Sequence, residues 1–332
     1  MTITYAPSHT TFVAEVSGVD FSNMTPEVVS DLKAGLAKYG VLVFRNTGLD
    51  DKSHVDFSRM FGDLDDIKPY SQLGRINRLA FDELFDVSNI DARGDVIMPG
   101  SVDWVMRNGN TIFHVDSSFN PRRAGYSLLL VHSLPPKGTG GGLEFADSRQ
   151  AYDDLDQATK DKIEPWVLMH SQHHSRKIAS PHAEILKDPK YKPESHPFGR
   201  HKVVQRHEAS GRMNLYIANH AYCIDGWEVK QSQKEIQELL DHASQPKYTC
   251  EVEWENPTDL VIWDNTCTLH RATLGEFDGK YKRDMRRTTV HDDSSLAWGH
   301  NNVGILGGLV CRKTDHLVSC LPCLVVPIRA HI

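Results

Sequence analysis

Ile112-Phe113-His114-Val115-Asp116-Ser117-Ser118-Phe119 is the stretch that says most about this chain. Residues two apart in a β-strand point to the same face, so His114 and Asp116 can reach one metal ion. A third ligand, His270, lies in the distant segment Leu269-His270-Arg271. Two imidazoles and one carboxylate are the ligand set of a mononuclear non-heme Fe(II) centre, which keeps positions open for a co-substrate and O2. We therefore predict a buried strand here that carries two ligands of an iron site.

The His-x-Asp pattern occurs twice more, at His54-Val55-Asp56 and at His291-Asp292-Asp293. The first copy lies among apolar residues at helical spacing, which puts His54 and Asp56 on different faces of an amphipathic helix. The second copy follows a strand-like run and is expected where a strand ends in a loop. The copy at His114 has the apolar flanks of a buried strand, and we favour it as the metal site.

The composition indicates a globular chain that acts on a small molecule. Its 332 residues are 39% hydrophobic, enough for a sizeable core, and its formal net charge is -7. This negative charge, without a long basic cluster, argues against binding to nucleic acid. The N-terminus lacks the pattern of a signal peptide and no segment is apolar for long enough to span a bilayer, so we expect a cytoplasmic protein without a membrane partner. The six cysteines do not make a disulfide scaffold.

Local patterns predict a mainly β fold, a sandwich or barrel with flanking helices. Thr25-Pro26 precede apolar residues at helical spacing and Gly40 follows them, which predicts a helix over residues 25–39. Residues 176–202 lack periodicity, which is typical of a long surface insertion. The other predicted helices cover residues 50–61, 150–162 and 232–243, and the predicted strands cover residues 41–44, 82–87, 89–98, 126–132, 166–170, 215–218, 249–254 and 260–263.

Several motifs, in a matching order, resemble one enzyme family. They are Phe113–Phe119, Gly140-Gly141-Gly142-Leu143-Glu144-Phe145, Trp263-Asp264-Asn265 before His270, and Gly40-Val41-Leu42-Val43-Phe44-Arg45. Over roughly residues 12–298 the chain resembles the taurine dioxygenase and 2,4-dichlorophenoxyacetate dioxygenase family of Fe(II)- and 2-oxoglutarate-dependent oxygenases. The resemblance implies a double-stranded β-helix, a jelly-roll sandwich with the iron between its sheets. It also implies a single oxygenase domain over residues 1–300.

The resemblance assigns the metal and its co-substrates. It makes His114, Asp116 and His270 the ligands of Fe(II), with 2-oxoglutarate as co-substrate and O2 as oxidant. The activity that it implies is oxidation of a C–H bond in a small anionic substrate, with succinate and CO2 as products. Hydroxylation next to an oxygen or sulfur substituent then releases an ether or sulfonate leaving group.

Two arginines near the C-terminal end of the resemblance match anion-binding positions of the family. Arg283 matches the arginine that binds the distal carboxylate of 2-oxoglutarate, and a planar guanidinium suits this task because it makes two parallel hydrogen bonds. Arg287 matches a second arginine, on the substrate side. Alternate residues of a strand face opposite ways, so we expect Arg283 and Arg287 to share a face with Met285 and Arg286 to point away.

Leu143 departs from the family pattern. The family commonly has a threonine at this position, whose hydroxyl joins the arginine in binding 2-oxoglutarate. A lost hydrogen bond to a charged group is worth roughly 1.5–3 kcal/mol. We therefore expect weaker binding of 2-oxoglutarate than in relatives, unless a neighbouring group substitutes.

The substrate side of the site is less defined by sequence. Asn110 matches a position that touches substrate in the family, and His220 is the best histidine candidate for the wall of the site. One alternative keeps the iron but cyclises or desaturates an amino-acid-like substrate. Another is a non-catalytic binding protein that retains the fold, an alternative to which Leu143 and the C-terminal tail lend weight.

The tail over residues 301–332 extends beyond the resemblance and has no assigned role. Its apolar end is interrupted by two prolines and is too short to span a membrane. An extra packing segment, a contact in a homo-oligomer and an unusual terminus remain alternatives.

Overall fold

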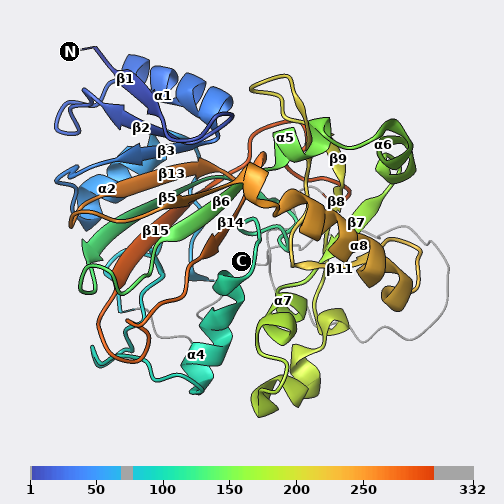
Figure 1. The fold of residues 1–332 in the computed structure, drawn as a ribbon. Helices are drawn as coiled ribbons and strands as arrows, with labels where there is room; N and C mark the ends of the chain where they lie inside the picture. Colours follow the sequence, from blue (N-terminus) through green and yellow to red (C-terminus); the bar gives the residue numbers. More distant parts are fainter. Residues whose placement is uncertain (1, 69–77, 303–332) are drawn as a thin grey trace, which may run out of the picture.

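The computed structural model describes residues 2–68 and 78–302, and most of the tail considered above lies outside this part (Figure 1). Its helices are α1 (Pro26–Tyr39), α2 (Asp51–Arg59), α4 (Val102–Arg107), α5 (Ser148–Asp153), α6 (Gln157–Ile163), α7 (Gln172–Ala179) and α8 (Val229–Ala243). Its strands are β1 (Thr4–Pro7), β2 (Ala14–Ser17), β3 (Val41–Phe44), β4 (Phe85–Asp86), β5 (Ala124–Ser133), β6 (Leu143–Asp147), β7 (Val167–His170), β8 (Gly199–Lys202), β9 (Val204–Arg206), β10 (Met213–Leu215), β11 (Ala221–Ile224), β12 (Thr249–Val252), β13 (Leu260–Asp264), β14 (Thr268–Ala272) and β15 (Asp284–His291).

A seven-stranded sheet forms one wall of the molecule, with strand order β1-β2-β3-β13-β5-β15-β4. Its strands pair antiparallel except for β2 and β3, which are parallel. Helices α1 and α2 cover its outer face, where Leu32, Leu36 and Phe57 pack against Leu42 and Leu128. The outer layer thus holds the central strands in place from behind.

Local signals place α1 where the sequence predicts it. The Thr25 hydroxyl accepts a hydrogen bond from the Val28 amide at 3.4 Å, and Pro26 occupies the first turn. Gly40 ends the helix with φ +70°, a left-handed conformation that favours glycine. Strand β3 follows at once, fully buried.

A second sheet, of order β12-β6-β14, faces the inner side of the large sheet. The core between the two includes Leu143 and Phe145 from β6, Val131 from β5, Trp263 from β13 and Met285 from β15. A third core lies around α5, α8 and the strands β7, β10 and β11, beside the two facing sheets (Figure 1). The prediction of a mainly β fold with flanking helices is confirmed.

Several predicted elements differ in detail from the structure. The helix predicted over residues 150–162 is two helices, α5 and α6, because Asp156 caps the second one and accepts a hydrogen bond from the Thr159 amide at 2.8 Å. The strands predicted over residues 82–98 reduce to β4 and one bridge, Ile90 to Val96. Residues 176–202 are not without structure: they begin inside α7, pass through three short 3₁₀ turns and end in β8.

The two further His-x-Asp copies lie where the sequence predicts. His54 is buried in α2, with its Nε2 atom 3.2 Å from the Leu128 carbonyl oxygen, whereas Asp56 is exposed on the other face. His291 ends β15, and the following Asp292 accepts a hydrogen bond from Arg123 at 2.7 Å. Within residues 2–68 and 78–302, neither copy brings its histidine and aspartate together with a third ligand.

Candidate metal centre and its cavity

Three predicted ligands come together at the inner side of the sheets. The His114 Nε2 atom lies 3.9 Å from Asp116 Oδ1, and the His270 Nε2 atom lies 3.6 Å from Asp116 Oδ2. All three side chains are buried, and their ligand atoms lie within 4.8 Å of one another. An arrangement of two imidazoles and one carboxylate around a single point can hold one metal ion.

The backbone route to this arrangement differs from the expected strand. His114 forms one antiparallel bridge with His270, through amide-to-carbonyl hydrogen bonds of 2.9 and 2.8 Å. The chain then turns at once, with Ser117 at φ +51°. The prediction of a regular strand over Ile112–Phe119 is therefore wrong, because the pairing partner is a distant segment that engages this stretch at one residue. Directly paired residues of an antiparallel bridge have their side chains on the same face, so both imidazoles reach one site, with ring centroids 4.2 Å apart.

Both histidines are suited to ligate a metal as neutral imidazoles. Burial lowers the pKa of His114. It lowers the pKa of His270 well below its ordinary value. The Nδ1 atom of His114 lies 2.8 Å from the Ile112 carbonyl oxygen, so it carries the proton and donates, which leaves the Nε2 lone pair for a metal. His270 Nδ1 has no hydrogen-bond partner in the described part of the chain.

Asp116 is held as a carboxylate by its neighbours. Burial alone raises its pKa, but the paired Arg287 guanidinium and the two histidines lower it below the usual value. Ser127 Oγ donates to Oδ2 at 2.7 Å. Asn265 accepts from the Asp116 amide at 3.0 Å and donates to Ser127 Oγ at 2.9 Å. This network places Asn265, part of a motif noted in the sequence, directly behind the candidate ligand.

A second buried cluster, His207, Asp264 and Cys267, has similar composition but is chemically occupied. His207 bonds Asp264 Oδ2 through Nε2 at 2.9 Å and Ser210 Oγ through Nδ1 at 2.6 Å. The other oxygen of Asp264 accepts from the amide and hydroxyl of Thr266. Since both ring nitrogens and both carboxylate oxygens have partners, this cluster is a structural hydrogen-bond network.

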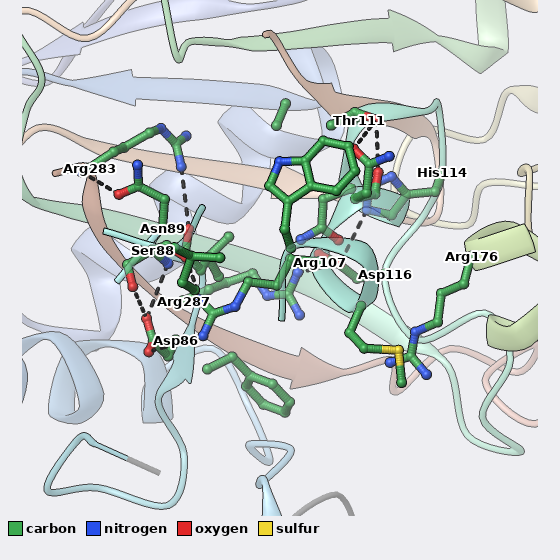
Figure 2. Close-up of a pocket in the computed structure, with 18 of the residues that line it drawn as sticks. Asp86, Ser88, Asn89, Arg107, Thr111, His114, Asp116, Arg176, Arg283 and Arg287 are labelled. Atoms are coloured by element: carbon green, nitrogen blue, oxygen red, sulfur yellow. Dashed lines mark hydrogen bonds and ion pairs between the residues drawn. The ribbon is translucent and has the colours of Figure 1, made fainter. Parts of the chain in front are cut away.

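A cavity of about 220 Å³ opens beside the triad, between the sheets, α4 and α7 (Figure 2). Of the predicted ligands, His114 and Asp116 line it, and so do four other predicted site residues: Asn110, His220, Arg283 and Arg287. Leu143 does not line it. That side chain is 4% exposed and packs in the core between the sheets.

Arg283 and Arg287 lie on the cavity side, whereas Arg286 points away to Asp51 and Asp284. Arg283 donates from Nε to the Gly141 carbonyl oxygen at 2.8 Å and from Nη1 to that of Val87 at 3.3 Å. No carboxylate pairs with Arg283 in the described part of the chain, and burial lowers its pKa to about 10. A buried guanidinium without a counter-ion favours an anionic ligand.

Sequence reasoning missed several cavity residues. Arg107 and Trp104 come from α4, and Arg176 comes from α7. The short helices that carry them gave no clear periodic signal. That the α7 segment approaches the cavity is a property of tertiary packing, which no local pattern in the sequence reveals.

A mainly β chain with two buried histidines and one carboxylate at a cavity wall is typical of non-heme Fe(II) oxygenases. Residues 4–289 match the family model described as "Taurine catabolism dioxygenase TauD, TfdA family", and the chain belongs to this family. It is an α-ketoglutarate-dependent dioxygenase, an enzyme class that uses Fe(II), 2-oxoglutarate and O2. The predicted family and enzyme class are confirmed.

Named relatives and solved structures give the range of similarity. The chain is 35% identical over 288 residues to the α-ketoglutarate-dependent 2,4-dichlorophenoxyacetate dioxygenase of Burkholderia sp. (strain RASC), covering 85% of this chain and 92% of the relative. It is 31% identical to the (S)-phenoxypropionate/α-ketoglutarate-dioxygenase of Sphingobium herbicidovorans, covering 89% and 98%. The crystal structure of AAD-2 in complex with Mn(II) and N-oxalylglycine matches with a TM-score of 0.78 and 34% identity, covering 88% and 98%. Within the described ranges, none of the helices has the length and apolar character to cross a membrane.

Asp65 is a buried carboxyl group close to the site that the sequence did not single out. Its amide donates to the Thr289 carbonyl oxygen at 2.8 Å, and its Oδ1 atom lies 3.9 Å from His291 Nε2. Its Oδ2 atom has no hydrogen-bond partner among the described residues. Burial raises the pKa of Asp65 to about 6, although the nearby Arg287 charge opposes the rise.

This raised pKa predicts a pH-dependent cost to stability. The carboxyl titrates near pH 6 when folded and near 3.9 when unfolded, so its favourable contribution is present below about pH 4 and is lost as pH rises through 6. Asp65→Asn should unfold with a higher free energy than the wild type at pH 7.5, by on the order of 1–3 kcal/mol. The advantage should shrink toward pH 5 in urea titrations. Asp63→Asn, at an exposed neighbour, is the control, and a pH-independent difference for Asp65→Asn would contradict this account.

Proposed function

We propose that this enzyme oxidises a C–H bond of a small anionic organic substrate, with conversion of 2-oxoglutarate and O2 to succinate and CO2. The product is a hydroxylated carbon, and where that carbon bears an ether or sulfonate substituent, the substituent leaves. The observation that carries this proposal is the buried His114, Asp116 and His270 group beside a cavity lined by arginines. The proposed scaffold is a double-stranded β-helix within one domain over residues 1–300.

His114, Asp116 and His270 would hold Fe(II). The group fits the metal because the histidines are neutral, the aspartate is ionised, and both Nε2 atoms lie near the carboxylate. When bound, Fe(II) with 2-oxoglutarate and O2 supplies the oxidising chemistry. The protein contributes binding, orientation and the exclusion of water.

Arg283 would bind the distal carboxylate of 2-oxoglutarate. Its Nε and Nη1 atoms donate to the Gly141 and Val87 carbonyl oxygens, which orients the guanidinium while its charge stays uncompensated. A carboxylate in the cavity supplies the missing counter-charge and accepts charge-assisted hydrogen bonds. The unfavourable burial of Arg283 is thereby relieved on binding.

Arg287, Asn110 and His220 are proposed to face the substrate, because all three line the cavity. The relatives named above act, by their names, on phenoxy acids, which supports an anionic aryl ether as substrate class. Oxidative cyclisation or desaturation of an amino-acid-like substrate stays the alternative, because an arginine-lined cavity suits an anionic group on either kind of substrate. The enzyme class leaves no reason to consider a non-catalytic protein. A cytoplasmic location and a homo-oligomeric state remain proposals.

The proposed function is tested by succinate release. Wild-type protein with Fe(II), 2-oxoglutarate and O2 should release succinate when 2,4-dichlorophenoxyacetate is added. His270→Ala should lower the rate beyond the roughly 10- to 100-fold losses typical of outer-shell metal partners. Cys267→Ser, in the second His-Asp-Cys cluster, is the matched control and should retain metal and rate. Full activity of His270→Ala would contradict the assignment of the metal site.

Leu143 generates a separate prediction about the co-substrate. Leu143 does not line the cavity, but it shares a core cluster with Met285, two residues from Arg283. We propose that the missing hydroxyl weakens 2-oxoglutarate binding there, so Leu143→Thr should lower the KM for 2-oxoglutarate by roughly 10- to 100-fold. Leu143→Val matches threonine in shape and lacks the hydroxyl, so it should not lower this KM. Because Leu143 packs in the core, both variants need a check of unfolding free energy. An unchanged or higher KM for Leu143→Thr would refute the idea.

A further inference from the structure

Ser118 joins two buried histidines behind the wall of the cavity. Its Oγ atom lies 2.9 Å from His220 Nδ1 and 3.1 Å from His170 Nδ1. Ser118 and His170 are 0% exposed, and His220 is 5% exposed. His220 lines the cavity, whereas Ser118 and His170 lie behind it. The three side chains thus form a hydrogen-bonded line that runs from the cavity into the protein interior.

Backbone pairing places the two rings beside Ser118. His170 ends β7, and β11 begins at Ala221, which pairs with His170. The Ser171 amide donates to the His220 carbonyl oxygen at 2.7 Å. The His220 ring also packs edge-on against the ring of His114, with centroids 5.5 Å apart. The backbone and this ring contact therefore hold His220 between a candidate metal ligand and Ser118.

The hydroxyl proton of Ser118 limits how the two rings can be protonated. Both rings are neutral, because burial lowers the pKa of His170 and of His220 well below the ordinary value. A neutral imidazole has one N–H and one nitrogen lone pair, and a serine hydroxyl has one proton. If both rings donated, the hydroxyl proton would lack an acceptor, since the described residues offer Ser118 Oγ no third partner. Ser118 therefore donates to one ring and accepts from the other.

The surroundings of His170 decide the direction of this line. The Nε2 atom of His170 has no hydrogen-bond partner in the described part of the chain. If His220 donated to Ser118, His170 would carry its proton on Nε2, as a buried N–H without an acceptor, and such groups are rare in folded proteins. The favoured arrangement has His170 Nδ1–H donating to Ser118 and the Ser118 hydroxyl donating to His220 Nδ1. His220 then carries its proton on Nε2, the ring nitrogen that remains for the cavity.

We propose that His170 and Ser118 are positioning residues that hold His220 as an Nε2–H donor, and that this N–H donates to an oxygen atom of the anionic substrate. The inference deepens the proposed function and rests on it for the class of ligand in the cavity. It adds the hydrogen-bond character of the substrate group beside His220, which is an acceptor such as a carboxylate or ether oxygen. The ammonium group of an amino-acid-like substrate has donors alone and does not fit this position.

The tautomers are measured by nuclear magnetic resonance of protein with isotope-labelled histidine. The protein is loaded with 2-oxoglutarate and with Zn(II), which is diamagnetic and redox-inert. Wild type should show His220 protonated on Nε2 and His170 protonated on Nδ1, with His220→Leu and His170→Leu used to assign the signals. Ser118→Ala and His170→Leu should each convert His220 to a mixture of both tautomers. His170→Asn should restore the single form, because an asparagine amide can donate to Ser118 in place of Nδ1–H.

The effect on binding is measured by calorimetry with 2,4-dichlorophenoxyacetate and the same loaded protein. Ser118→Ala and His170→Leu should weaken binding about 2- to 10-fold, the worth of one neutral hydrogen bond, and His220→Leu about 10- to 100-fold. Adding Ser118→Ala to His220→Leu should cause no further loss, because Ser118 acts through His220. Ser210→Ala is the matched control and should bind as wild type does, since Ser210 Oγ bonds His207 Nδ1 at 2.6 Å outside the cavity lining. Binding of 2-oxoglutarate should be the same in every variant.

A wild-type His220 that is protonated on Nδ1 would overturn the proposal, and so would unchanged binding of the acid by Ser118→Ala. An equal loss from Ser118→Ala in the wild-type and His220→Leu backgrounds would mean that Ser118 only packs. A wild type that binds 2-oxoglutarate but not the acid would contradict the assignment of the His220 N–H to a substrate oxygen. Failure of the proposed function has a different signature, since it appears as absent 2-oxoglutarate binding and no succinate release by the iron-loaded wild type.

Discussion

The candidate metal centre depends on one backbone contact, the bridge between His114 and His270. Its two hydrogen bonds, of 2.9 and 2.8 Å, join the segment after α4 to β14. Strand β14 is itself fixed in the second sheet by β6, whose Phe145 pairs with His270. Backbone pairing thus positions the two histidines, which explains how residues far apart in sequence meet at one site. Asp116 is held there by Ser127, Arg287 and Asn265.

Charge placement around this bridge follows from burial. Asp116 is ionised because Arg287, Ser127 and the histidines offset the cost of burying it. Arg283 is buried without a carboxylate partner in the described residues, and its two carbonyl contacts leave its charge for a ligand. The cavity therefore has a metal-binding end at the compensated carboxylate of Asp116 and an anion-binding end at the guanidinium of Arg283. A buried charge without a partner is costly, so Asp116 is surrounded by groups that stabilise it and Arg283 favours an anionic ligand.

Local sequence signals anticipated much of this fold. Helix α1 was predictable because Thr25 and Gly40 cap an apolar stripe, and these signals act within a few residues. The arginine faces of β15 were predictable from alternation. The strand expected over Ile112–Phe119 was not formed, because pairing depends on a partner that local pattern does not reveal. Arg176 was missed for the same reason, since its route to the cavity depends on how α7 packs against the turn Asn108–Thr111.

The resemblance to a known family added what local patterns could not give. The resemblance, together with the apolar residues around His114, selected His114 over the two other His-x-Asp copies. It also pointed to Arg283. Leu143 shows the boundary of such transfer, because the position matches the family but the side chain packs between Val252 and other core residues instead of lining the cavity. A resemblance can identify the matching position in this chain, but what the side chain there can bind depends on which residue occupies it.

The most direct measurement of the central claim is an anaerobic titration of the protein with Fe(II) and then 2-oxoglutarate, followed by visible absorption. A metal held by two histidines and one carboxylate, and chelated by a keto acid, should give a charge-transfer band that saturates at one equivalent of iron and is lost in Asp116→Ala. A folded wild-type protein that gives no band, or an Asp116→Ala variant that keeps it, would contradict the account.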